Sequence, residues 1–162
     1  MAADRATVSV SASLLPDEIK TTVGGTSVYD IDDIGDNNKW TYSLTIVGAS
    51  EEDALLASVP FLGQGTAEEG STASANSTDD IVFLFVKHSG TTDGSTATTA
   101  NLHLNLGGGS ATGSVVGDIV LGPNECFFAK LGNTEINDVN ADSSSGSIQA
   151  QVFAICDDGG VS

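Results

Sequence analysis

The sequence predicts an all-β protein, an antiparallel β-sandwich or jelly-roll-like fold. Three observations support this prediction. Short stretches alternate between apolar and polar residues with a period of two. Glycine-rich turns separate these stretches, in a chain with nineteen glycines and only three prolines. Helical periodicity is almost absent. A chain of 162 residues can bury one core without disulfides, so we expect residues 1–162 to form a single domain.

The first strands are predicted from alternation. RATVSVSAS places Val8, Val10 and Ala12 on one side, and a second strand is expected at 27–31. In TYSLTIVG, 41–48, the tyrosine, leucine and isoleucine at 42, 44 and 46 share one side, which we expect to be the core side, opposite a wet side of threonines and serine. Residues 1–40 are richer in acids and turns, which indicates an N-terminal arm or edge hairpin laid on the body.

One short helix at most is expected, near 51–58. Ser50 can cap it, acids at 51–53 suit its first turn, and Pro60 ends it. The following stretch, 63–80, has no apolar periodicity and predicts an exposed loop.

The second half of the chain has the most regular pattern. Strands are predicted at 81–87, in NLHLNL at 101–106, and at 118–121, 125–131, 134–140 and 147–156. GPNE at 122–125 predicts a tight turn, because proline presets the turn backbone and asparagine follows it.

The stretch DIVFLFVKH is apolar on both sides of its predicted strand. The set Ile81, Phe83, Phe85 and the set Val82, Leu84, Val86 would point in opposite directions, and Phe127 and Phe128 give CFFAKL a similar character. One set would fill the core. The other must be covered by the N-terminal arm or by a second subunit, and the sequence leaves both open. These eight residues are the candidate interface or core positions.

Charge and hydropathy exclude several classes of partner. Five basic against 22 acidic residues give a net charge of −17, which disfavours nucleic acid and anionic membranes. No apolar run approaches a membrane span, and MAADRATVSVSAS lacks the features of a signal peptide, so we expect folding in a cytoplasm.

No motif predicts a catalytic, cofactor or metal site. DIDDIGDNN, 30–38, misses two ligand positions of an EF-hand, so a solvated acidic turn is favoured, with a different calcium loop left open. His88 and His103 are expected to be surface residues, and Cys126 and Cys156 buried reduced thiols.

The runs FLFVKHSGTTDGSTATTANLHLNLGGG and DIVLGPNECFFAKLGNTEINDVNADSSSGSIQAQVFAICDD resemble small virion structural proteins of tailed phages, particularly those of marine cyanobacteria. The resemblance covers about the second half of the chain, and its motifs are structural. It implies a non-enzymatic capsid decoration or cement protein that bridges shell subunits, with a major capsid protein or other virion proteins as partners. It also implies a homo-oligomer, with a trimer favoured, located in the virion after assembly in the host cytoplasm. The alternative is a carbohydrate- or receptor-binding sandwich of a tail or fibre, for which Trp40 is the weak candidate residue.

Overall fold

The computed structural model describes residues 5–14, 21–30, 39–49, 53–56, 59, 61, 79–107 and 118–157. These residues form ten strands and one short 3-10 helix. The strands are β1 (Arg5–Leu14), β2 (Thr21–Asp30), β3 (Lys39–Val47), β4 (Asp53–Ala54), β5 (Asp80–His88), β6 (Leu102–Asn105), β7 (Ile119–Leu121), β8 (Cys126–Lys130), β9 (Asn140–Ser143) and β10 (Ile148–Asp157). The 3-10 helix η1 spans Ile136–Asp138.

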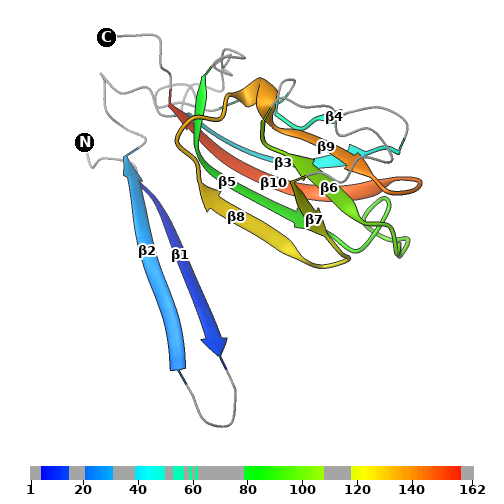
Figure 1. Ribbon diagram of the computed structural model, residues 1–162, viewed down its shortest axis with the longest axis horizontal. Helices are drawn as coiled ribbons and strands as arrows, with labels where there is room; N and C mark the ends of the chain where they lie inside the picture. The colour runs from blue at the N-terminus through cyan, green and yellow to red at the C-terminus, as the bar shows by residue number, and fades with distance from the viewer. Residues whose placement is uncertain are drawn as a thin grey trace.

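The body is a β-sandwich of two four-stranded antiparallel sheets. One sheet has the strand order β3-β10-β5-β8 and the other β4-β9-β6-β7. Figure 1 shows the two sheets packed as layers. The predicted all-β sandwich is therefore confirmed.

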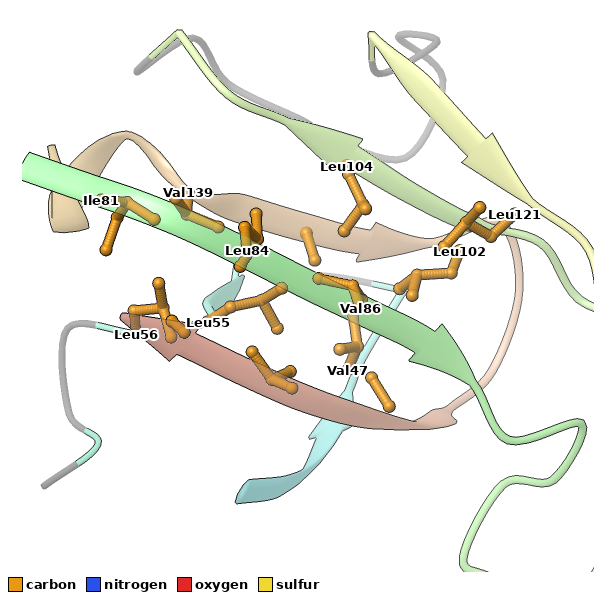
Figure 2. Close-up of a cluster of buried hydrophobic side chains, with 14 of the residues drawn as sticks. Val47, Leu55, Leu56, Ile81, Leu84, Val86, Leu102, Leu104, Leu121 and Val139 are labelled. Carbon is orange, nitrogen blue, oxygen red and sulfur yellow. The ribbon is translucent and has the colours of Figure 1, made fainter. Parts of the chain in front are cut away.

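The core lies between the sheets and consists of side chains from both inner faces. Figure 2 shows Leu84 and Val86 of β5 extending toward the same space as Leu102 and Leu104 of β6. All four are fully buried. At roughly 25 cal/mol per Å² of apolar surface removed from water, this layer is the main stabilising element of the body.

A β-bulge in the central strand pair decides which side chains of β5 enter the core. Phe83 pairs with Ile155, but the next pair is Ile81 with Cys156, so Val82 is an extra residue in β5. The strict alternation is broken there, and Ile81 joins the core together with Leu84 and Val86. Phe83 and Phe85 point out of the sandwich, and Val82 is half-buried.

β1 and β2 form a separate antiparallel hairpin, here called the arm. Its register runs from the Arg5–Asp30 pair to the Leu14–Thr21 pair. The arm projects away from the two packed sheets in Figure 1, where it is drawn in blue. Tyr29 of the arm contacts Phe83 of β5, with ring centroids 5.7 Å apart. The hairpin therefore touches the sandwich through the part of the arm that carries Tyr29.

One predicted element, a strand at 134–140, is wrong, and the short helix allowed near 51–58 is not present in the described residues of that stretch. The strand expected at 134–140 begins only at Asn140, because 136–138 form the 3-10 helix, in which the side chain of Asp138 accepts a hydrogen bond from the Glu135 amide at 3.4 Å. In place of the helix expected near 51–58, Asp53 and Ala54 pair with β9, and Leu55 and Leu56 turn into the core. Of the loop expected at 63–80, residues 63–78 lie outside the described part, and Asp80 opens β5.

Candidate functional site on the outer face of one sheet

Strand β3 presents its apolar side chains to solvent, which is the reverse of the expected orientation. Tyr42, Leu44 and Ile46 are 57%, 54% and 50% exposed, whereas Thr41 is buried. The register explains the inversion. Val47 pairs with Ile148 and both fill the core, so every second residue back along β3 must also point inward. Alternation shows that Tyr42, Leu44 and Ile46 share a side, but not which side is wet.

We call the side of the β3-β10-β5-β8 sheet that points away from the core the outer face. Alternation from the inward residues, combined with the strand registers, assigns its members. They are Trp40, Tyr42, Leu44 and Ile46 on β3, Gln149, Gln151, Phe153 and Ile155 on β10, Phe83, Phe85 and Lys87 on β5, and Cys126, Phe128 and Lys130 on β8.

The outer face is apolar and carries no acidic side chain at any of these positions. Its only charges are the two lysines, in a chain of net charge −17. Acids enter this side of the sheet only beyond the bulge, where Asp80 pairs with Asp157. Among the described residues, the acidic side chains therefore lie away from these positions, and a surface of this kind is typical of contact with another molecule.

The candidate interface residues predicted from sequence divide between the core and the outer face. Leu84, Val86 and Ile81 are core residues, and Phe127 packs against the core from β8. Phe83 and Phe85 belong to the outer face. Phe128 is 42% exposed.

A groove separates the arm from the outer face. It has a volume of about 410 Å³, and its walls come from both units: Val8, Val10, Gly25, Thr26, Ser27 and Tyr29 on the arm, and Phe83, Phe128, Ala129 and Lys130 on the sheet. The Tyr29 hydroxyl is buried and has no hydrogen-bond partner. A buried hydroxyl normally has one, so Tyr29 brings an unsatisfied polar atom to the contact between the arm and the sheet.

The groove borders the free edge of β8. Within the described residues β8 is an edge strand, paired only with β5. The Leu131 amide donates to the Val82 carbonyl at 3.2 Å, so Leu131, which directly follows β8, and Val82 of β5 form a hydrogen-bonded pair. Because bonded and non-bonded pairs alternate in an antiparallel ladder, the backbone groups of Phe128 and Lys130 point away from β5. Sequence reasoning missed both the groove and this edge, since neither depends on a motif.

The weak glycan candidate Trp40 is half-buried on the outer face, paired with Ile155 and two positions from Tyr42. The expectation for the thiols is correct for Cys156, which is buried, and wrong for Cys126, which is exposed on β8.

His88 is fully buried, so the expectation that it is a surface residue is wrong. Its Nδ1 accepts a hydrogen bond from the Gly90 amide at 2.9 Å, and its Nε2 lies 3.0 Å from the Ala100 carbonyl oxygen, to which it donates. The ring therefore ties together the two ends of the loop between β5 and β6 and satisfies its own polar atoms in the core.

The other sheet has a polar outward side. His103 lies directly opposite Asp142, and Asn105 lies opposite Asn140. Asp142 is 1% exposed, and neither of its carboxylate oxygens has a hydrogen-bond partner. Nδ1 of His103, which is half-buried, is also unpartnered. Within the described ranges, no group of three His, Cys, Asp or Glu residues is placed to hold a metal ion. The possible calcium loop at 31–38 lies outside those ranges.

The loop after β5 contains a well-formed Asx turn. The Asp93 carboxylate accepts hydrogen bonds from the backbone amides of Thr96 at 2.8 Å and Ser95 at 2.9 Å, and from the hydroxyls of both residues. These bonds favour the charged form and lower the pKa of Asp93 from 3.8 to about 2, with the Thr96 amide as the largest cause. The turn is a structural feature, because the carboxylate's hydrogen bonds fix the backbone of its own loop.

Among the described residues there is no helix long and apolar enough to span a membrane. Comparison of the chain with protein-family models, with curated proteins and with solved structures gives no match.

Proposed function

We propose that this protein is a non-enzymatic structural protein of a phage virion, most plainly a capsid decoration protein that docks on a neighbouring shell subunit through its outer face. The observation that carries the proposal is the outer face itself, which is apolar and free of acidic side chains in a chain of net charge −17. Burying such a face against a partner removes apolar surface from water without desolvating a carboxylate.

The charge distribution also supports docking on a larger assembly. Repulsion between acidic surfaces disfavours contacts through the parts of the surface that carry acids. Docking through the face that lacks acids leaves the acidic surface pointing outward. Tyr42, Leu44 and Ile46 form the most exposed apolar part of this face and are the expected centre of the contact.

The test has two parts. The first is whether the protein co-sediments with intact particles, and the second is whether polar substitutions on the outer face abolish that co-sedimentation. The double variant Leu44→Ser, Ile46→Ser should remain folded, because both side chains are about half exposed, and should no longer co-sediment with particles. Val120→Ser is the matched control, since Val120 is an exposed apolar residue on the outward side of the opposite sheet. Co-sedimentation that survives the double variant, or that is equally lost in the control, would contradict the proposal.

Glycan binding at a tail or fibre is the second candidate, favoured by one observation. Trp40 and Tyr42 are two positions apart on the outward side of β3, so their rings lie on the same face, and aromatic side chains can stack on sugars. The test is binding on a glycan array. This candidate is favoured over shell docking if Tyr42→Ala and Trp40→Ala each abolish glycan binding while Leu44→Ser retains it.

A further inference from the structure

We propose that the groove between the arm and the sheet receives the arm of a second copy of this chain, and that a strand of that arm adds to the free edge of β8. The inference does not depend on the identity of the partner proposed above, because it concerns the contact between copies. It commits to one occupant, the hairpin of β1 and β2 from another molecule.

The first argument is that the arm buries little apolar surface against its own chain. A two-stranded hairpin is at best marginally stable alone in water, because it cannot bury enough apolar surface. The arm leaves Val28 55% exposed, and the strand residues around it, from Gly24 to Ser27, are exposed as well. Contact with a second protein surface would supply the missing burial.

The second argument is chemical complementarity between the arm and the site. In the two strands of the arm the only charged residues are Arg5 and Asp30, which face each other at one end of the hairpin. The groove contains one charge, Lys130, and no acid. In a chain of net charge −17, these are two surfaces that two copies can bring together without repulsion between carboxylates.

The third argument is the backbone at the site. The outward amide and carbonyl groups of Phe128 and Lys130 form an unpaired strand edge, which is a template for a further strand. The groove beside it is lined by the apolar side chains of Val8, Val10, Phe83 and Phe128 together with the polar Thr26, Ser27 and Lys130. An added strand would bond to the edge and bury these apolar side chains.

The arrangement lets every copy both give and receive an arm. Reciprocal exchange between two copies would close a two-fold dimer, and passing arms in one direction would close a ring such as a trimer. In either case each arm lies between its own sheet and that of its neighbour.

The native thiol of Cys126 allows a direct test, since it is exposed on the outward side of β8. A new thiol is introduced on the arm by Ser11→Cys and, in a second protein, by Thr7→Cys, both at exposed positions. Mild oxidation of the full-length proteins should give a disulfide-linked dimer on a non-reducing gel from at least one of them. Adding Cys126→Ser should abolish that band. Linkage only within single chains, or dimers that persist without Cys126, would overturn the proposal.

Sedimentation of the full chain supplies an independent measurement. Wild type should be oligomeric, and Lys130→Pro should raise the dissociation constant about tenfold or more, because it removes an outward amide that β5 does not use. Lys130→Gln is the matched control, which keeps the amide and should change the constant less than Lys130→Pro does. A wild type that stays monomeric at every concentration, or equal constants for the two variants, would overturn the proposal. Co-sedimentation with particles is scored separately, so failure of arm exchange is distinguishable from failure of shell docking.

Discussion

The two sheets of the sandwich share one core but differ on the sides that point away from it. The β3-β10-β5-β8 sheet presents an apolar outer face with no acid at its assigned positions, and the β4-β9-β6-β7 sheet presents His103, Asn105, Asn140 and Asp142. A polar outward side is the ordinary solution for an antiparallel sheet in water. The contrast is that one outward side of this sandwich carries polar side chains and the other mostly apolar ones.

The largest effect is expected in the layer that both sheets share. Leu84→Ala removes a fully buried side chain and should lower the free energy of unfolding by about 2–5 kcal/mol, because a cavity remains. Leu44→Ala, on the same sheet but on the outer face, should cost less than about 0.5 kcal/mol. Urea denaturation measures both. Similar losses in the two variants would break the distinction between the inner and outer sides of this sheet.

A smaller effect is expected where the arm covers the outer face. Phe83 is nearly buried by Tyr29 and Phe153 on the outward side, so Phe83→Ala should cost about 2–3 kcal/mol, less than a Phe in the closed core. Amide hydrogen exchange in β1 and β2 should also accelerate, because the arm loses its aromatic contact. Phe85→Ala, which does not line the groove, should leave arm exchange unchanged. The reverse order would show that the arm is held elsewhere.

The variant Asp142→Asn tests how the buried carboxylate on the polar side of the other sheet affects stability. A buried carboxylate without a hydrogen-bond partner is costly, and an amide in its place can donate to the unpartnered Nδ1 of His103. We expect stabilisation on the order of 1 kcal/mol, measured at pH 7 as a higher melting temperature. Asp80→Asn, at an exposed position, should change stability by less than about 0.5 kcal/mol. Destabilisation by Asp142→Asn would mean that the carboxylate stabilises the fold through an interaction other than a hydrogen bond.

The smallest effect concerns stability at acidic pH and arises from Asp93, in the loop after β5 and away from the outward sides of both sheets. The folded-state pKa of Asp93 is lowered to about 2, below its ordinary value of 3.8. Its contribution to stability is therefore fully present above about 3.8 and is lost as pH falls toward about 2. An NMR titration of the Asp93 carboxyl should show a midpoint near 2, and Thr96→Pro, which removes the amide that contributes most, should raise it. A midpoint near 3.8 in the wild type would contradict the Asx turn.

Local chemistry made several features predictable. The alternation in NLHLNL places Leu102 and Leu104 in the core, as expected. In the GPNE turn, Asn124 adopts φ 69°, a value that asparagine tolerates better than most residues, and the Glu125 amide donates to the Gly122 carbonyl. The two-sided character of 81–86 is that of β5, which lies between β10 and β8 within its sheet.

The candidate site depended on information that no single strand contains. Alternation groups Tyr42 with Leu44 and Ile46, but only the pairing of Val47 with Ile148 turns the group outward. The orientation of Phe83 depends on a bulge against β10, far away in the sequence. His88 is polar, yet the loop from Gly90 to Ala100 surrounds it with bonding partners and makes its burial possible.

The sequence by itself determined the all-β class, the most regular strands, the turns and the charge, because these follow from local periodicity, backbone preferences and composition. Only the tertiary structure decided which side of each strand faces the core, where the bulge falls, and that an apolar face, a free strand edge and an arm lie together. The physical reason is that register and sheet order are set by long-range pairing, and a shift of one residue exchanges the inner and outer side chains of a strand.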